Sequence, residues 1–213
     1  MTDLQVTPRS TVRRRRERAS YDRALVNGVL DESLSCHVGF AVEGRPFVIP
    51  TIHARVDDRL YLHGAPANHM LNSLRRGIEA CVTATLVDGL VLARSAFHHS
   101  LNYRSVCLFG WAAAVTDRGE KVAALHALVE HVLAGRSASV RPPSEKELSG
   151  TLVLRLPIDE ASAKVRTGPP IDDQEDIGLD VWAGVVPLRI ITDTPIPAPD
   201  LPRHVSHSLF GRP

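Results

Sequence analysis

Apolar residues recur along the chain in short runs, and most of these runs have the length and composition of β-strands. They are rich in valine, isoleucine and leucine, and turn signals such as EGR and DD separate the first of them. This spacing is typical of antiparallel hairpins and not of strands joined by crossover helices. The runs predict strands at residues 36–42, 45–56, 59–64, 80–87, 103–115, 151–158 and 183–191.

Helical spacing interrupts the strand pattern near the beginning of the chain and again after residue 65. Tyr21, Leu25 and Val29 fall on one face of a helical wheel and predict a short first helix. Pro66 stands near the start of the second helical segment, and Gly77 supplies its C-terminal stop. Two short helices are therefore expected, one before the first hairpin and one after the third strand run.

A longer helix is expected over residues 120–135, where apolar residues at helical spacing share one face. Ser144 and Glu147 have the spacing of a capping box and predict a further helix start. Because strands prevail and the helices fall between hairpins, the pattern predicts an α+β fold that is mainly β. We expect an antiparallel barrel with inserted helices.

The two ends of the chain lack this periodicity. The first 23 residues hold seven arginines against three acidic residues, and the last 22 residues hold five prolines. Segments of this composition cannot bury enough apolar surface to offset the entropy lost on ordering. We therefore expect a disordered basic arm at residues 1–20, a folded domain at 21–192 and a disordered, proline-rich tail at 193–213.

Composition narrows the class of protein and its compartment. The chain has 213 residues, of which 44% are hydrophobic and 23% charged, and this suits one globular domain. No apolar signal region follows the basic arm, and no run of about 18 apolar residues occurs, so we expect a cytoplasmic protein with no membrane partner. The arginine run RRRRER lacks interleaved aromatic residues, so no nucleic-acid partner is expected either.

Metal binding and nucleophilic catalysis find little support in the sequence. Cys36, Cys81 and Cys107 stand singly in apolar runs without C-x-x-C spacing, and we interpret them as buried thiols. His98 and His99 would point to opposite faces of a strand, and no third ligand stands at a metal-site spacing. No metal site is expected, and no Ser-His-Asp order, Walker loop or G-x-G-x-x-G motif is found.

One polar stretch breaks the apolar pattern between two predicted strands. It is RSAFHHSLNYRSV, residues 94–106. Together with SYDRALVNGVLDE, HVGFAVEGRPFVIPT, RLYLHGAPANHML, KVRTGPP and VWAGVVPL, it resembles the flavin-nucleotide-binding branch of the pyridoxamine 5′-phosphate oxidase superfamily. The resemblance covers about residues 13–191. It implies an FMN-binding split β-barrel that is a homodimer, with FMN at the subunit interface and the polar stretch lining the flavin cleft.

The resemblance assigns the flavin phosphate to the turn HGAPANHM, where a helix start offers free N–H groups. Asn68 and His69 could add donors there, in the place of the arginine or lysine common in the family. The further candidates for cationic contacts are Arg104, Lys164 and Arg166, because guanidinium and ammonium groups bind phosphate. Each of these cations could instead pair with a carboxylate or lie in solvent.

Polar side chains would bind the edge of the isoalloxazine ring of FMN, and an aromatic side chain would lie near it. The polar candidates are Thr51, Ser95, Asn102, Tyr103 and Ser105. Trp182 resembles the family's C-terminal aromatic residue near the flavin, and a core position is the alternative. His63 stands where the related nitroimidazole-resistance reductases have a functional histidine, and the alternative is a hydrogen-bonded histidine without a role in binding.

Three functions of different class follow from these features. The first is an FMN-dependent oxidoreductase that carries electrons from a reduced nicotinamide to a small-molecule substrate, with no catalytic residue identified. The second is a non-catalytic module that binds or stores FMN, haem or a deazaflavin, and the third is an interaction protein with a decayed cleft. Oxidation of pyridoxamine phosphate itself is not expected, because WAGVVPLRI lacks the arginine and histidine pattern with which the oxidases hold the substrate phosphate.

Overall fold

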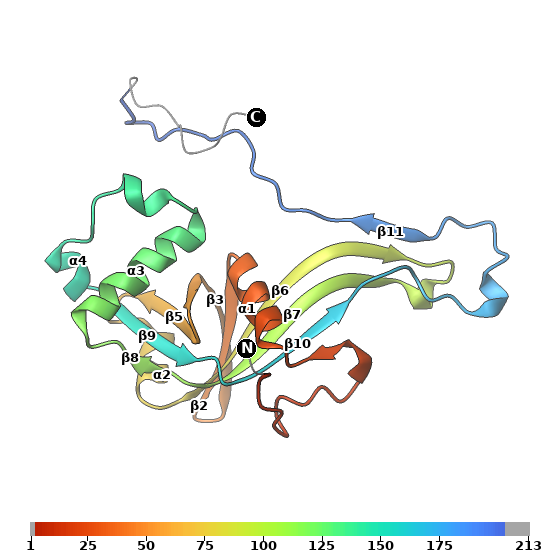
Figure 1. Cartoon of the computed structure of the whole chain (residues 1–213), viewed down its shortest axis with the longest axis horizontal. Helices are drawn as coiled ribbons and strands as arrows, with labels where there is room; N and C mark the ends of the chain where they lie inside the picture. The colour runs from red at the N-terminus through yellow and green to blue at the C-terminus, as the bar shows by residue number, and fades with distance from the viewer. Residues whose placement is uncertain (1–2, 203–213) are drawn as a thin grey trace.

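The computed structural model describes residues 3–202, and its strands form two antiparallel sheets (Figure 1). The larger sheet has the strand order β1-β10-β7-β6-β2-β3, and β11 also pairs with β6. The strands of this sheet are β1 (Ala19–Ser20), β2 (Cys36–Val42), β3 (Arg45–Thr51), β6 (Glu79–Leu92), β7 (Ser100–Trp111), β10 (Glu160–Arg166) and β11 (Gly184–Pro187). The smaller sheet has the order β4-β5-β9-β8, with β4 (His53–Val56), β5 (Arg59–Gly64), β8 (Ala113–Ala114) and β9 (Leu152–Pro157).

Each of the four α-helices in the described residues begins at a side chain that caps it. The helices are α1 (Arg23–Glu32), α2 (His69–Arg75), α3 (Arg118–Val132) and α4 (Glu145–Ser149), with the N-caps Asp22, Asn68, Asp117 and Ser144. These side chains accept hydrogen bonds from backbone N–H groups that the first turn of a helix leaves unpaired. The predicted capping box of Ser144 and Glu147 is confirmed, and so is the α+β, mainly β class.

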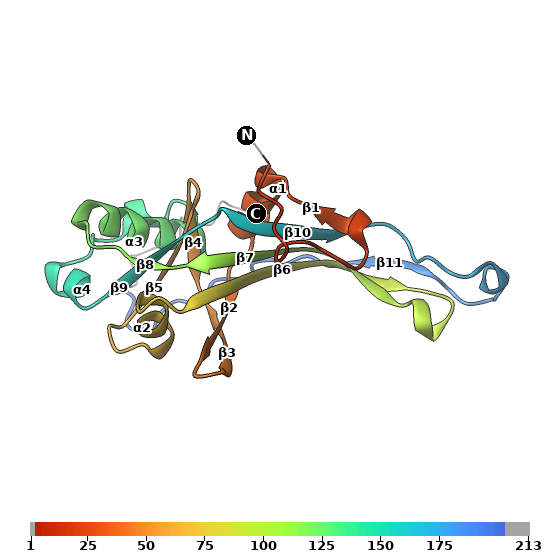
Figure 2. The same ribbon diagram turned by 90° about the horizontal axis from the view of Figure 1, so that it is seen from below.

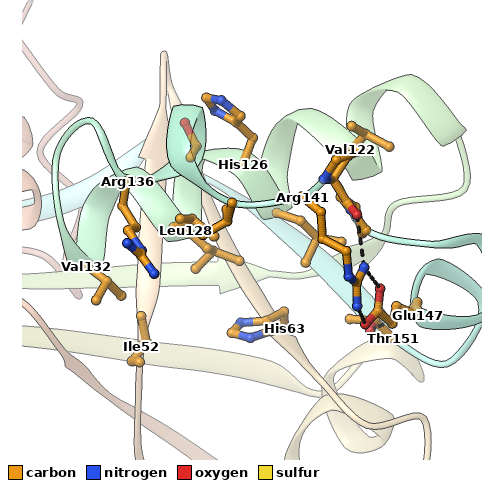
Figure 3. A pocket seen from close by; sticks show the side chains of 16 residues that line it. Ile52, His63, Val122, His126, Leu128, Val132, Arg136, Arg141, Glu147 and Thr151 are labelled. Carbon is orange, nitrogen blue, oxygen red and sulfur yellow. Dashed lines mark hydrogen bonds and ion pairs between the residues drawn. The ribbon is translucent and has the colours of Figure 1, made fainter. Parts of the chain in front are cut away.

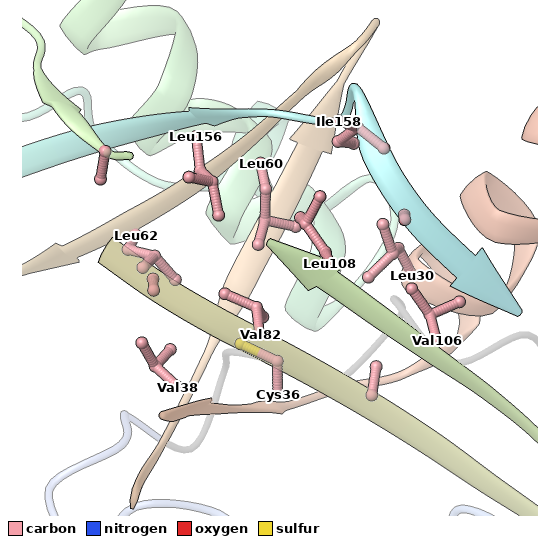
Figure 4. Packing of buried hydrophobic residues seen from close by; sticks show 14 of the residues in the cluster. Leu30, Cys36, Val38, Leu60, Leu62, Val82, Val106, Leu108, Leu156 and Ile158 are labelled. Atoms are coloured by element: carbon pink, nitrogen blue, oxygen red, sulfur yellow. The ribbon is translucent and has the colours of Figure 1, made fainter. Parts of the chain in front are cut away.

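The core lies between the two sheets and is closed at one side by α1 (Figure 4). Alternate residues of the strands point into it, which is the consequence of the two-residue period of a strand. Leu62 of β5, Leu108 of β7 and Leu156 of β9 meet there with Leu30 of α1, and each is at most 1% exposed. Burial of such side chains supplies about 1.5 to 3 kcal/mol each relative to the exposed state.

Several predicted strand boundaries differ from the structure. The run 80–87 belongs to a strand that continues to Leu92, and the run 103–115 starts earlier, at Ser100, and divides at Ala112, where the chain passes from the larger sheet to the smaller one. The run 45–56 divides at Ile52, where the chain passes from the larger sheet to the smaller one. The division follows burial, because β3 is an exposed edge strand whereas His53 and Ala54 of β4 are buried. The predicted strand 183–191 is paired only over Gly184–Pro187.

The polar stretch at residues 94–106 lies largely in a long hairpin that extends from the body of the molecule (Figures 1 and 2). Strand β6 reaches Leu92, a short 3₁₀ helix, η2 (Ala96–His98), forms the turn, and β7 returns from Ser100. A bulge between Val87 and Gly89 interrupts the pairing of the two strands. The stretch thus supplies both the hairpin tip and the first half of β7.

The N-terminal segment packs on the sheet, unlike the disordered arm predicted for residues 1–20. Leu4 is only 3% exposed, and its N–H donates to the carbonyl oxygen of Tyr21 at 2.8 Å. Arg9 forms an ion pair with Glu79 at 2.7 Å and a second ion pair with Glu160. The segment also contains the 3₁₀ helix η1 (Arg16–Arg18) and strand β1, which pairs with β10. Composition did not predict that this segment is ordered, because most of the residues that it contacts lie far away in the sequence.

The C-terminal segment has no helix or strand between Leu188 and residue 202, and its large aliphatic side chains lie in solvent. Ile190, Ile191 and Ile196 are 84%, 82% and 95% exposed. The rest of the predicted tail, residues 203–213, lies outside the described residues. Across residues 3–202, no helix combines the length and the apolar character needed to cross a membrane.

Candidate functional site

An apolar cavity of about 730 Å³ lies beside α3 and the segment that follows it (Figure 3). Its other walls come from Ile52, between β3 and β4, and from the end of β5. The wall supplied by α3 is aliphatic, because this helix turns one face of its apolar residues toward the space. These residues are Val122, Leu125, Leu128, Val129 and Val132.

His63 is the one titratable side chain that β5 contributes to this cavity. Its Nδ1 atom is buried and has no hydrogen-bond partner among the described residues. Burial lowers the pKa of the imidazole below its usual value, because the apolar surroundings disfavour the charged ring. The ring is therefore neutral at pH 7 and has a lone pair for a metal centre. In Figure 3 the ring lies below Leu128 and to the right of Ile52.

Two arginines and a second histidine stand around the same cavity. Arg141 is paired with Glu147, at 2.7 and 2.6 Å, so its charge is already balanced. Arg136 lies at the start of η3 (Arg136–Ser139) and has no ion pair within residues 3–202. Figure 3 shows its side chain extending from the helical wall toward Ile52. His126 is an exposed residue of α3 that also lines the space. The cavity thus joins an apolar interior to one uncompensated cation.

Five of the predicted site residues gather on neighbouring strands away from this cavity. In the register of β7 and β10, Tyr103 lies opposite Arg166 and Ser105 lies opposite Lys164. Asn102 joins them because its Oδ1 atom accepts a hydrogen bond from Nη1 of Arg166. We name these five residues the β7–β10 cluster.

Arg166 is a buried cation without a carboxylate partner among the described residues. It is 6% exposed, and its other hydrogen bonds go to the carbonyl oxygens of Gly168 at 3.3 Å and Pro169 at 3.1 Å. Burial lowers the pKa of this guanidinium, and the positive charge of Arg18 lowers it further. A buried charge is costly unless an opposite charge balances it. The β7–β10 cluster is therefore suited to an anionic ligand.

Arg104 is in a different situation, although it is a neighbour of the cluster in sequence. It bonds Asp88 through Nε at 3.0 Å and Nη2 at 2.7 Å, and it bonds Glu32 through Nη2 at 2.8 Å. The hydrogen bond from Arg104 lowers the pKa of the Glu32 carboxyl, because it stabilises the ionised form. The charge of Arg104 is therefore balanced by the carboxylates of Glu32 and Asp88. Pairing with a carboxylate is the alternative to a phosphate contact that the sequence left open.

The ion pairs of Arg104 predict a pH-dependent loss of stability in the Arg104→Gln variant. A depressed carboxyl pKa contributes stability above the unfolded-state pKa, and this contribution is lost as the pH falls through the folded-state pKa. We expect the variant to be less stable than the wild type by about 1 kcal/mol at pH 7, since the pairs are partly exposed. The difference should shrink toward about pH 3. Urea denaturation at both pH values measures it, and an equal difference at the two would contradict the assignment.

Asn68 and His69 are engaged at the start of α2. The side-chain oxygen of Asn68 accepts from the N–H of Leu71 at 3.0 Å and so caps the helix. The His69 ring lies 5.1 Å from the Phe47 ring, and its Nδ1 atom is 3.2 Å from Oγ of Ser73. Both residues therefore have local structural partners at the turn where the sequence predicted a phosphate.

The three other predicted residues belong to none of these groups. Thr51 ends β3, and its hydroxyl donates only to the carbonyl oxygen of Ile52, at 3.4 Å. The Oγ atom of Ser95 is buried without a partner among the described residues. Trp182 is 65% exposed, so it is not the core residue that was the alternative. Its ring covers Gly184, where a Cβ atom would come within 2.9 Å of it.

Sequence reasoning missed the contribution of α3 and the segment after it to the cavity. The sequence did carry a signal for this wall, because the apolar face of α3 has more residues than the helix buries in the core. Only Ala124 and Leu128 of α3 are buried in the described chain. No sequence motif pointed to Arg136 or Arg141 as residues of a site. Within residues 3–202, no group of three His, Cys, Asp or Glu side chains could hold a metal ion.

Comparison with known proteins places this fold among relatives. The sequence model described as pyridoxamine 5′-phosphate oxidase matches residues 22–165. The structure of the flavocytochrome Anf3 from Azotobacter vinelandii is similar with 40% identity and a TM-score of 0.87, over 94% of this chain and 93% of that one.

A second solved structure is similar to almost the same extent. It is the FAD and haem binding protein from Mycobacterium smegmatis, with 37% identity and a TM-score of 0.85, over 89% of this chain and 93% of that one. A search of curated proteins gave no match. The family match spans most of the chain, and both structures share its fold and more than a third of its sequence. The chain therefore belongs to the pyridoxamine 5′-phosphate oxidase family, as its sequence motifs predicted.

Proposed function

We propose that this chain is a redox protein that binds haem in the cavity beside His63 and a flavin nucleotide at the β7–β10 cluster. The observation that carries the proposal is the buried, unpartnered imidazole at the wall of a large aliphatic cavity. Haem requires an apolar space for its macrocycle and an axial ligand for its iron. The names of the two similar structures support the same pair of cofactors, because one is a flavocytochrome and the other binds FAD and haem.

The residues around the cavity fit the separate parts of a haem group. The neutral His63 imidazole can ligate the iron, and the aliphatic face of α3 can cover the ring. Arg136 has no ion pair among the described residues and can pair with a propionate at the edge. The iron, the ring and a propionate of haem thus each have a matching partner in the cavity. A histidine on the protein surface would offer a ligand for the iron alone.

The β7–β10 cluster fits the phosphate of a flavin nucleotide. Arg166 can supply a charge-assisted contact without giving up a carboxylate, and Lys164 lies on the same strand. Tyr103 can donate to a carbonyl oxygen of a flavin ring, whereas the Ser105 hydroxyl already donates to the carbonyl oxygen of Lys164 at 3.3 Å. FMN is the nucleotide that the sequence predicts, and FAD carries the same ring with a further phosphate.

Flavin and haem together supply electron transfer from a two-electron donor such as a reduced nicotinamide to a small acceptor. The chain's part is to bind and orient. His63 would supply the iron ligand, α3 would exclude water from one side of the cavity, and Arg166 would hold the nucleotide phosphate. Among the described residues we assign no side chain as proton donor, so the proposal is an oxidoreductase acting on a small molecule without a named substrate. A non-catalytic store of the same cofactors is the alternative.

We further propose that two copies of the chain form the working unit. Edge strand β3 exposes Val48 by 64%, and the segment after β11 exposes Ile190 and Ile191 almost completely. A second copy would cover such aliphatic surface, which monomeric proteins seldom expose. The split barrel that the family resemblance implies would then be completed across the interface.

Titration of the purified chain with haemin and with FMN or FAD tests the proposal. We expect a haem Soret band, quenching of flavin fluorescence, and reduction of the bound flavin when a reduced nicotinamide is added. Cofactor binding without reduction or turnover would favour the storage alternative. Absence of both signals would contradict the proposal. Sedimentation of the same samples should give twice the chain mass of 23.2 kDa.

A further inference from the structure

Two cysteines on neighbouring strands lie in direct contact outside the cavity and the β7–β10 cluster. The Sγ atoms of Cys81 on β6 and Cys107 on β7 are 3.5 Å apart. In the register of these strands Cys81 lies opposite Phe109 and Cys107 lies opposite Thr83, so the cysteines are diagonal neighbours on one face of the sheet. A disulfide needs an S–S distance of about 2.05 Å, and diagonal neighbours on adjacent strands lie about 7 to 8 Å apart, so closing the bond requires the strands as well as the side chains to move.

This face is half-buried beneath the N-terminal segment, and both thiols are free. The guanidinium of Arg9 lies 4.7 Å from the ring centre of Phe109, and Arg9 also pairs with Glu79 and Glu160. The charge of Arg9 is largely balanced by these two carboxylates, and what remains of it favours the thiolate, the reactive form of the side chain, at both cysteines. Each of the two sulfurs therefore has a second thiol in contact with it for exchange.

The two sulfurs differ in their readiness to ionise. The hydrogen bond with Cys107 lowers the pKa of Cys81, whereas the charge of Arg9 acts to lower the pKa of both thiols. The hydrogen bond with Cys81 and burial raise the pKa of Cys107. Cys36 is fully buried away from this pair, and burial raises the pKa of its thiol to about 12. Cys36 thus serves as an internal control, because it has no thiol partner and solvent does not reach it.

We propose that Cys81 and Cys107 form a reversible dithiol–disulfide site, with Cys81 as the attacking thiolate and Cys107 as the resolving thiol. The oxidant is a low-molecular-weight disulfide. The Cys81 thiolate attacks one of its sulfurs, which forms a mixed disulfide and releases the other half as a thiolate. Cys107 gives its proton to the released thiolate and attacks the Cys81 sulfur, which forms the intramolecular bond and releases the second half as a thiolate that takes a proton from water. Two protein thiols are oxidised, and one external disulfide is reduced to two thiols.

Reaction of the full-length protein with excess oxidised glutathione, followed by intact mass and peptide mapping, tests this assignment. The wild-type chain should lose the mass of two hydrogens, retain no glutathione, link the Cys81 and Cys107 peptides, and return to its starting mass with dithiothreitol. The Cys107→Ser variant should instead retain one glutathione on Cys81, because the resolving thiol is absent. The Cys81→Ser variant should react at least about tenfold more slowly than wild type.

Cys36→Ala is the matched control, and it should behave as the wild type does. Circular dichroism of each variant before the reaction establishes that the comparison is made on folded protein. A wild-type chain that keeps three free thiols, or that keeps glutathione without forming the internal bond, would overturn the proposal. Equal reactivity of the Cys81→Ser and Cys107→Ser variants would overturn the roles of the two sulfurs. None of these outcomes depends on haem or flavin binding.

Discussion

Replacing His63 with alanine is expected to weaken haem binding by more than about 100-fold, since even loss of a residue that only orients a metal ligand costs about 10 to 100-fold. The buried Nδ1 atom has no partner among the described residues, so its removal breaks no hydrogen bond there. The substitution should therefore leave the melting temperature near that of the wild type while it removes the Soret band. Absorbance titration with haemin measures the affinity, and a fold-change of 100 corresponds to about 2.7 kcal/mol.

His126→Ala is the control for this experiment, because His126 lines the same cavity but is exposed on α3. We expect haem affinity to be unchanged in this variant. Added imidazole should restore a haem spectrum in the His63→Gly variant, because the free ligand can enter the space that the side chain leaves. If His126→Ala lost the spectrum and His63→Ala retained it, the ligand assignment would be wrong.

Replacing Arg166 with alanine is expected to weaken FMN binding by about 10 to 100-fold, which is the cost of about 1.5 to 3 kcal/mol for a lost charge-assisted contact. Riboflavin has the same ring without the phosphate, so its affinity should change little. The ratio of the two affinities separates phosphate contact from damage to the loop that Arg166 holds through Gly168 and Pro169. Quenching of flavin fluorescence measures both ligands.

Arg104→Gln is the matched control, because the charge of Arg104 is balanced by Glu32 and Asp88. It should lower stability and leave the ratio of FMN to riboflavin affinity unchanged. Lysine at position 166 should recover part of the FMN affinity, since it keeps the charge but not the planar donor geometry. Equal weakening of FMN and riboflavin in Arg166→Ala would remove Arg166 from the phosphate site.

The sequence by itself determined the local elements and the family of this protein. Alternating and continuous apolar runs identified the strands, and the spacing of Ser144 and Glu147 identified a helix start, because both signals act over a few residues. The motifs around the polar stretch identified the family that the comparisons confirm. The partial errors lay at Ile52, at Ala112, after Pro187 and at the hairpin end of β6 and β7, where burial and sheet pairing decide how far a strand continues.

The tertiary structure alone decided which side chains meet. Arg104 and Arg166 had equal standing in the sequence, but the first lies between two carboxylates and the second is buried among neutral oxygens. Leu4 and Arg9 belonged to an arm predicted to be disordered, yet they pack on residues far away in the chain. Local periodicity fixes the face on which a residue lies. The residue's partner depends on contacts between distant segments, and only the packed sheets bring those segments together.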